Sequence, residues 1–324
     1  MKRVNELLKY ADLSGKGMEV APYFNPTLPK RDGNDVLILD VFDTERLRLL
    51  AKMDKDIPNE RIHEIEDVDF VGDACQIGQV VREESLAGKL SYIISSHNFE
   101  HLPNPILFLQ GCSDALKEGG VLSMAVPDYR ACYDFFRMPT RLSDWLLAYH
   151  QNFKQPPEHI IFDSVSMSSR YLKDGKSMTG CDIHKDDPGK FTSNHDLVTA
   201  YRDYQSSLLS NRAYTDVHCS VVFPELLELL LRDLRKIGLI DLDVLEISKT
   251  QGGEFFVHLS KSKSGFLDDD TFYDIRDKLL VSVSGNMGSA PYKICLSTAS
   301  IRRMRSLFRK MRNVVKNRKK KDNA

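Results

Sequence analysis

The sequence predicts an α/β fold built on a mostly parallel sheet, with helices on both faces and an antiparallel strand at one edge. Short apolar runs alternate with helical patterns through the first 130 residues, and this alternation resumes near residue 216. Strands that alternate with helices are typical of a parallel sheet. The last two apolar runs, 241–247 and 254–259, are joined by a glycine turn, which predicts an antiparallel hairpin.

Five apolar runs in the first part of the chain have the length and the polar borders of buried strands. They are 17–20, 35–40, 68–71, 90–96 and 121–126. A helix with one apolar stripe is predicted from Pro105 to Lys117, and the glycines after Glu118 end it.

The rest of the chain divides by its residue patterns. A strand at 216–223 and a helix from Pro224 to Ile237 continue the α/β pattern. Between them and the first part lies a polar, aromatic segment without a clear strand pattern, which predicts a mostly helical insertion that covers the substrate. The predicted parts are a core of 1–130 and 215–263, the insertion 131–214, an irregular extension 264–300 and a helix at 301–324.

Charge is distributed unevenly along the 324 residues. The totals of 45 basic and 46 acidic side chains give a net charge of −1. Residues 301–324 hold eleven Lys or Arg and one Asp, and the remaining 300 residues hold 34 basic and 45 acidic side chains. Apolar residues recur on one face of this basic tail, from Ile301 to Val315, which predicts an amphipathic helix.

A basic amphipathic helix of this kind binds anionic membrane surfaces, so we expect the protein in the cytoplasm at the inner face of a membrane. Docking on an acidic protein surface and binding of nucleic acid are the alternatives. The composition excludes other classes. No apolar stretch reaches the roughly 18–20 residues of a membrane span, and the start has no apolar signal segment. The six cysteines lack paired spacing, which argues against a disulfide scaffold or a zinc ribbon.

Polar residues follow each predicted strand of the first part. Ligands of open α/β sheets bind at these carboxyl ends, near the point where the strand order reverses. The segments that follow the strands are Ala21–Pro26, Asp40, Asp73–Ala74, Ser96–His101 and Pro127–Arg130.

The order of these motifs resembles the class I S-adenosylmethionine-dependent methyltransferases, and most closely the branch found with bacterial surface-polysaccharide genes. The similarity covers roughly 15–130 and 215–260 and implies a Rossmann-like fold. The family usually has glycine where this chain has Ala21. The motifs that carry the resemblance are Met18–Pro22, Asn25–Pro26, Ile38–Asp40, Gly72–Ala74, Ser95–Pro105, Leu116–Leu122, Ala125–Asp128, Asp216–His218 and Phe223–Glu225.

The resemblance implies S-adenosylmethionine as the cofactor. Asp40 would accept hydrogen bonds from the ribose hydroxyls, and Glu19 would face the cationic side of the methionine group. The chain lacks the G-x-G-x-x-G spacing that a pyrophosphate needs, which agrees with a nucleoside cofactor. The predicted cofactor-binding residues are Glu19, Ala21, Pro22, Asn25, Asp40, Asp73, Ala74, Ser96 and His97.

Methyl transfer to an alcohol needs a well-placed acceptor and a general base. The predicted catalytic residues are His218, Asp128 and His101, and the residues do not decide among them. Tyr129, Arg130, His184 and His195 are predicted to bind the substrate, and Tyr133 and Arg137 are further candidates to line its site.

The segment His97-x-x-Glu100-His101 also matches the spacing of the inverted zinc proteases. Pro103 and Pro105 would interrupt the helix that this chemistry requires. We expect no metal here, and His97, Glu100 and His101 are the residues that would hold a divalent cation in the alternative.

The sequence therefore predicts an enzyme that transfers a methyl group from S-adenosylmethionine, most plausibly to a hydroxyl of a glycan or lipid-linked sugar. The alternatives are a binding protein that retains the fold without the activity and a methyltransferase acting on RNA. Homo-oligomerisation is also open.

Overall fold

The computed structural model describes residues 2–55, 57–193, 196–209, 213–262 and 267–288. The chain divides into two compact units, Met1–Ser284 and Gly285–Ala324, and the sheet, the helices that cover it and the site residues belong to the first. The predicted amphipathic helix at 301–324, with Cys295 and His195, lies outside the described residues.

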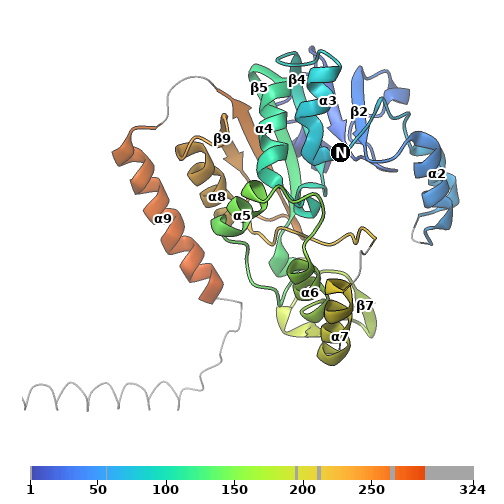
Figure 1. Ribbon diagram of the computed structural model, residues 1–324, viewed down its shortest axis with the longest axis vertical. Coiled ribbons are helices and arrows are strands. Elements are labelled where there is room, and N and C mark those ends of the chain that lie inside the picture. The colour runs from blue at the N-terminus through green and yellow to red at the C-terminus, as the bar shows by residue number, and fades with distance from the viewer. Residues whose placement is uncertain (1, 56, 194–195, 210–212, 263–266, 289–324) are drawn as a thin grey trace, which may run out of the picture. The chain divides into compact units, whose positions relative to one another are not determined.

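A seven-stranded sheet with the order β3-β2-β1-β4-β5-β10-β9 forms the centre of the first unit (Figure 1). Strands β1 to β5 pair with one another in parallel, whereas β10 pairs antiparallel with both β5 and β9. The predicted α/β fold with an antiparallel hairpin at one edge is confirmed. The strands are β1 Gly17–Val20, β2 Val36–Asp40, β3 Phe70–Val71, β4 Leu90–Ser96, β5 Leu116–Pro127, β9 Leu242–Ile247 and β10 Glu254–Lys261.

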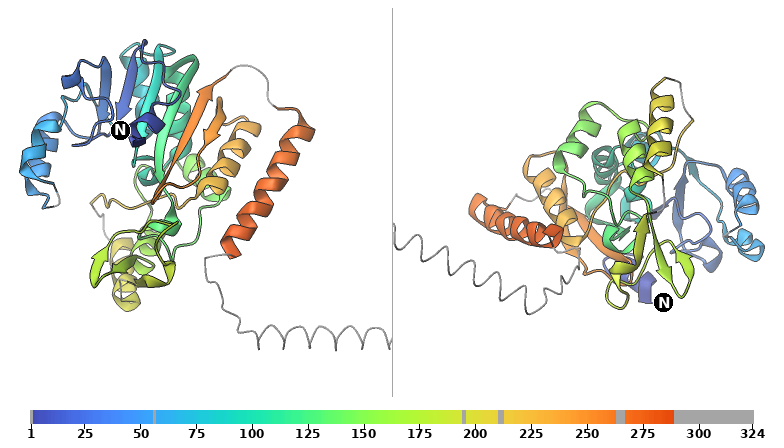
Figure 2. Two further views of the ribbon diagram at one scale, coloured as in Figure 1. Left: turned by 180° about the vertical axis from the view of Figure 1, so that it is seen from behind. Right: turned by 90° about the horizontal axis from the view of Figure 1, so that it is seen from below.

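Helices cover one face of the sheet more extensively than the other (Figure 2). On one face α3, α4 and α8 pack over the large apolar core, which α9 joins through Leu279 and Val283. On the other face the short helix α1 packs Leu7 against a smaller cluster that contains Tyr92 and Phe256. The bounds are α1 Lys2–Leu7, α2 Thr44–Met53, α3 Ile77–Glu83, α4 Pro105–Ala115, α8 Pro224–Lys236 and α9 Asp269–Gly288.

The central elements follow directly from their residues. All but the last residue of β4 are buried, because the strand lies between β1 and β5 and is covered on both faces. Helix α8 begins at Pro224, whose missing amide hydrogen costs nothing at a helix start, and its leucines recur at helical spacing on the buried face.

The insertion is not mostly helical, as predicted, but mixed. It contains the helices α5 (Leu142–His150), α6 (Glu158–Ser166) and α7 (Leu197–Leu208). It also contains an antiparallel sheet in the order β7-β6-β8. These strands escaped prediction because they are three to five residues long and mostly exposed, so they lack apolar alternation. Their bounds are β6 Ser169–Lys173, β7 Lys176–Met178 and β8 Phe191–Ser193.

Two further predictions about the elements are wrong. The predicted strand at 216–223 is a loop that joins neither sheet, because its amides bond elsewhere: Cys219 and Ser220 donate to the carbonyl of Glu100, in the helical turn Phe99–His101. The predicted irregular extension contains helix α9, whose Phe272 and Leu279 are buried against the body of the first unit.

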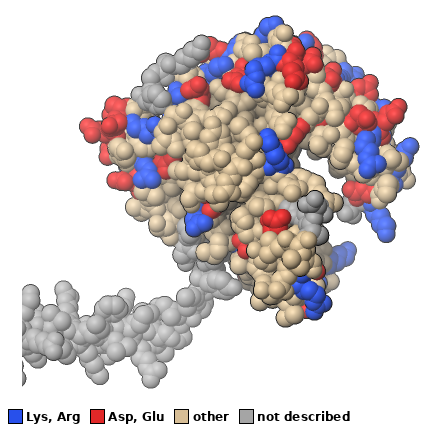
Figure 3. Space-filling view, in the orientation of Figure 1, with Lys and Arg blue, Asp and Glu red and all other residues tan. Residues whose placement is uncertain are grey.

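None of the described helices has both the length and the apolar character needed to cross a bilayer. On the face drawn in Figure 3, the basic and acidic side chains of the described residues are interspersed. Several form ion pairs across short distances, such as Arg31 with Glu66 and Arg82 with Asp114.

Candidate active site

The carboxyl ends of β1, β2, β3 and β4 lie side by side, on either side of the point where the strand order reverses. Val20 is paired with Leu39 of β2 and with Ser95 of β4, and Asp40 is paired with Val71. Ligands of open α/β sheets bind at this position. The structure thus brings the predicted cofactor-binding segments to one edge.

The turn after β1 has a strained backbone. Ala21 has a φ of +51° and Tyr23 a φ of +49°, both in the left-handed region that favours glycine. The Ala21 amide donates to the carbonyl of Leu39, which keeps the turn close to β2. The chain therefore has alanine at a position whose backbone conformation suits glycine better.

Glu19 holds the loop that follows this turn. Its carboxylate is buried and accepts hydrogen bonds from the amides of Thr27 at 2.7 Å and Leu28 at 3.2 Å. Burial raises the pKa of Glu19, and these amides partly oppose the rise. Its predicted contact with the methionine group stays a prediction.

Acidic residues also end β2 and β3. Asp40 is 5% exposed, and burial raises its pKa. Its carboxylate accepts from the amide of Phe42 at 3.2 Å. Asp73 caps the short turn Ala74–Gln76 by accepting from the amide of Cys75. Asn25, in the loop after β1, lies 3.4 Å from a guanidinium nitrogen of Arg61.

A charged network holds the loop after β4. Arg3 on α1 donates to Ser96 Oγ at 2.6 Å and binds both carboxylate oxygens of Glu254 at 2.7 and 2.9 Å. His97 has a φ of +49°, and its Nε2 lies 2.9 Å from Glu254. Burial alone would lower the pKa of His97, but the carboxylates of Glu100 and Glu254 raise it to about 9.

Beyond this loop lies a pocket of about 570 Å³. One part of its wall comes from the core, including His97, Glu100 and His101. The insertion supplies the facing part with Lys173, Thr179, Asp182 and Asp186. The pocket therefore joins the loop after β4 to the insertion.

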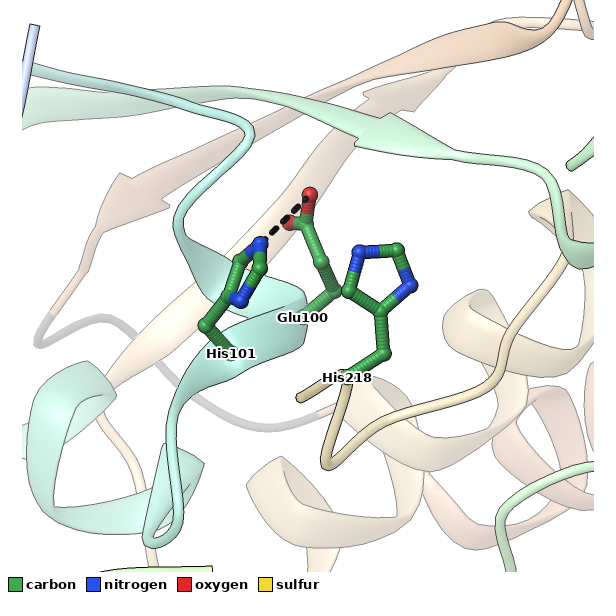
Figure 4. A group of neighbouring side chains, drawn as sticks. All are labelled: Glu100, His101 and His218. Carbon is green, nitrogen blue, oxygen red and sulfur yellow. Dashed lines mark ion pairs between the residues drawn. The ribbon is translucent and has the colours of Figure 1, made fainter. Parts of the chain in front are cut away.

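Glu100, His101 and His218 form a cluster in this pocket (Figure 4), which we call the EHH cluster. One ligand-type atom from each lies within 4.8 Å of the others. Glu100 is 1% exposed, and no described residue donates a hydrogen bond of good geometry to either carboxylate oxygen. The nearest nitrogens are His97 Nδ1 at 3.4 Å and His101 Nε2 at 3.9 Å from Oε1.

Each imidazole of the EHH cluster is held from behind by a carboxylate. His101 Nδ1 lies 2.9 Å from Asp216, and His218 Nδ1 lies 2.5 Å from Asp134. Because a carboxylate only accepts, each Nδ1 is the donor. Each Nε2 is therefore free of that bond, and Tyr133 Oη lies 2.7 Å from His218 Nε2.

The carboxylates around the EHH cluster shift the pKa values of its groups. Burial alone would lower the pKa of His101, but Asp216 and Glu100 raise it. Burial alone would raise the pKa of Glu100, yet the surrounding imidazoles lower it on balance. The electrostatic environment of the EHH cluster thus favours a charged carboxylate and positive charge beside it.

Asp128 does not lie in the pocket, which corrects its predicted catalytic role. It is fully buried, and its carboxylate binds the guanidinium of Arg130 at 2.6 and 2.9 Å and accepts from Thr250 Oγ1 at 2.5 Å. Arg130 in turn lies 4.7 Å above the ring of Phe223. Both side chains stabilise the turn after β5. Arg130 is not among the residues that line the pocket, contrary to its predicted role in substrate binding.

The other predicted substrate residues fall into different places. Tyr129 packs against Phe223, with ring centroids 5.9 Å apart. His184 Nε2 bonds to the carbonyl of Thr250 in a separate hollow, and His195 lies outside the described residues. Tyr133, which the sequence offered as a candidate to line the substrate site, contacts His218 of the EHH cluster.

Two residues of the site were not predicted from the sequence as partners. Asp134 lies 84 residues before His218, so no local spacing indicates their contact. Asp216 belongs to a motif that carries the family resemblance, but its contact with His101 spans 115 residues. Among the metal candidates, Glu100 and His101 come together with His218, whereas His97 bonds to Glu254.

No protein-family model matches the chain, and none of the curated proteins is significantly similar to it. Solved structures with similarity include the PH0226 protein from Pyrococcus horikoshii OT3, at 16% identity and a TM-score of 0.39 over 81% of this chain and 91% of that chain. A SAM-dependent methyltransferase from Archaeoglobus fulgidus matches at 13% identity and a TM-score of 0.33, over 80% and 92%.

The CcbJ methyltransferase from Streptomyces caelestis matches at 10% identity and a TM-score of 0.37, over 80% of this chain and 93% of that chain. Similarity at this level does not identify a reaction. The function is therefore inferred from the residues of the site.

Proposed function

We propose that this protein transfers a methyl group from S-adenosylmethionine to a hydroxyl of an acceptor bound in the pocket. The observation that carries the proposal is the loop after β4, which joins the cofactor-side residues Ser96 and His97 to the EHH cluster. In this proposal the cofactor lies across the carboxyl ends of β1, β2 and β4. Asp40 accepts from its ribose, and the turn at Ala21 approaches its methionine group.

The reaction breaks the S–CH₃ bond and forms an O–CH₃ bond, so the sulfonium becomes a neutral thioether and the hydroxyl loses its proton. Positioning supplies most of the acceleration of such an in-line displacement. The EHH cluster offers acceptor atoms for the hydroxyl hydrogen, and the carboxylates of Asp134 and Asp216 hold the two imidazoles in place.

The acceptor class we propose is a glycan or a lipid-linked sugar. The wall supplied by the insertion supports this, because it presents polar side chains: Lys173 and Asp186 form an ion pair at 2.9 Å, and Asp182 and Thr179 lie nearby in the same wall. Hydroxyl-rich ligands suit such a wall better than an apolar one.

The test is a transfer assay with radiolabelled S-adenosylmethionine and sugar-lipid and glycan-precursor acceptors, together with calorimetry of cofactor binding. We expect binding and label transfer to a hydroxyl. Absence of binding at millimolar cofactor would overturn the enzyme proposal in favour of a binding protein. Label transfer to RNA instead of sugars would refute the acceptor class.

We also propose that residues 301–324 attach the protein to anionic membranes. The support is the basic amphipathic pattern of this segment, which lies outside the described residues. A chain that ends at Ala299 should no longer co-sediment with anionic vesicles. Sedimentation equal to that of the full chain would refute the attachment.

A further inference from the structure

We infer that the EHH cluster is a binding site for a divalent transition-metal cation. Glu100 and His101 come from the loop after β4, and His218 comes from the loop that follows the insertion. The fold thus brings three side chains that ligate metals, far apart in the chain, into one pocket.

The three side chains converge on a common point. Figure 4 shows both imidazoles directed at the carboxylate of Glu100, and the three ligand-type atoms lie within 4.8 Å of one another. Ligands bound at about 2.1 Å in a tetrahedral site are roughly 3.4 Å apart. The 3.9 Å between His101 Nε2 and Glu100 Oε1 needs only a small side-chain adjustment to reach that spacing.

The residues behind the imidazoles match those of metal sites. A histidine that binds a metal through one nitrogen almost always donates its other N–H to a carboxylate or carbonyl. Asp216 and Asp134 accept from Nδ1 of His101 and His218, so the Nε2 atoms are the ones that would bind a cation, once His218 Nε2 exchanges its hydrogen bond with Tyr133 Oη for it.

Glu100 supplies an independent indication. Its carboxylate is 1% exposed, and no described residue donates a hydrogen bond of good geometry to either oxygen; the nearest nitrogens are those of His97 and His101, 3.4 and 3.9 Å from Oε1. Both of these contacts are longer than a hydrogen bond of good geometry and involve Oε1, and a buried ionised carboxylate is costly unless it is closely paired or binds a metal. A cation between Glu100 and the two Nε2 atoms would satisfy it.

Two imidazoles and one carboxylate select the class of cation. Imidazole suits zinc, iron, cobalt and nickel, whereas magnesium and calcium prefer oxygen ligands. Three protein ligands leave one coordination position of the cation open toward the pocket. When the cation binds, the hydrogen bond between Tyr133 Oη and His218 Nε2 would break.

The role of the cation rests on the proposed function, although its binding does not. A bound cation lowers the pKa of a coordinated hydroxyl. The acceptor would then lose its proton to solvent water, its oxygen would bind the methyl carbon, and the S–CH₃ bond would break. His101 and His218 would act as ligands in this state.

The test uses the untagged full-length protein, freed of metal with a chelator and titrated with Co²⁺. We expect one equivalent to bind with the visible absorption of a nitrogen- and oxygen-ligated cobalt ion, and Zn²⁺ to displace it. Millimolar Mg²⁺ should not compete. The melting temperature should rise with Co²⁺ concentration.

Glu100→Gln and His218→Gln should each weaken Co²⁺ binding at least 100-fold, and Asp216→Asn about 10–100-fold. His63→Gln, at an exposed histidine on the short helical segment Asn59–Glu64, is the matched control and should bind like the parent. Melting of each variant without metal shows whether it is folded.

Failure of the parent protein to bind Co²⁺, or equal binding by folded Glu100→Gln, would overturn the inference and leave Glu100 paired with protonated histidines. Calorimetry with S-adenosylmethionine on the metal-free protein separates the two proposals. Cofactor binding without Co²⁺ binding refutes the metal site alone, and Co²⁺ binding without cofactor binding refutes the proposed function alone.

Discussion

His218 Nδ1 lies 2.5 Å from Oδ2 of Asp134, and both side chains are almost completely buried. The other oxygen of Asp134 accepts from Arg137 at 2.8 Å, and the same guanidinium nitrogen donates to the carbonyl of His218. One buried carboxylate thus joins the start of the insertion to the loop that follows it. This contact places His218 in the pocket.

Removing Asp134 should destabilise the protein strongly. Asp134→Ala leaves Arg137 buried without its counterion, and breaking a buried pair in this way costs about 3–5 kcal/mol. Chemical denaturation of the variant measures this cost as a loss of unfolding free energy.

The exposed pair Arg141–Asp144 has the same sequence spacing and provides the control. Asp144→Ala should cost only about 1 kcal/mol, because exposed pairs and caps contribute little. Equal losses for the two variants would contradict the structural role assigned to Asp134.

Ala21→Gly should stabilise the protein. An alanine in the left-handed conformation destabilises the folded state by roughly 1–2 kcal/mol, and glycine removes this strain. Glycine also increases the conformational entropy of the unfolded chain, which cancels part of the gain in stability. We expect a net gain of about 0.5–1 kcal/mol in urea denaturation. Gly33→Ala, at a φ of +87° with open space around it, should shift stability by a similar amount in the opposite direction.

Asp40→Ala should weaken binding of S-adenosylmethionine. Loss of hydrogen bonds from the ribose to a carboxylate is worth on the order of 1–3 kcal/mol. Calorimetry measures the change, and Glu45→Ala on the exposed side of α2 serves as the control. Unchanged affinity in Asp40→Ala would refute the ribose contact.

His258 should make stability depend on pH below neutrality. Burial between Ser123 and Tyr10 lowers its pKa from 6.5 to about 4, so the unfolded chain binds the proton more tightly. Stability from this residue is therefore complete above pH 6.5 and is lost as the pH falls toward 4, by up to about 3 kcal/mol.

The variant His258→Asn keeps an acceptor or donor near Ser123 without titrating. Denaturation between pH 4 and 7 should show a flatter decline than in the parent protein, whatever the absolute stability of the variant. Parallel curves would show that His258 does not titrate as its burial implies.

Local patterns sufficed for most of the sheet. The runs at 17–20, 35–40 and 90–96 are strands because apolar residues between polar borders have few other ways to be buried. The run at 216–223 looks the same, but no neighbouring strand is available to it. Val221 instead exchanges hydrogen bonds with Thr140, a partner that local sequence does not reveal.

The sequence by itself determined the α/β class and the set of polar residues that follow the strands, because both depend on periodicity and on the direction of parallel strands. Only the tertiary structure decided how those residues are used. Asp128 and Asp134 are both acids after β5, yet Arg130 and Thr250 bind the first, whereas His218 and Arg137 bind the second. The contacts with Thr250 and His218 span 122 and 84 residues, and no local pattern encodes them.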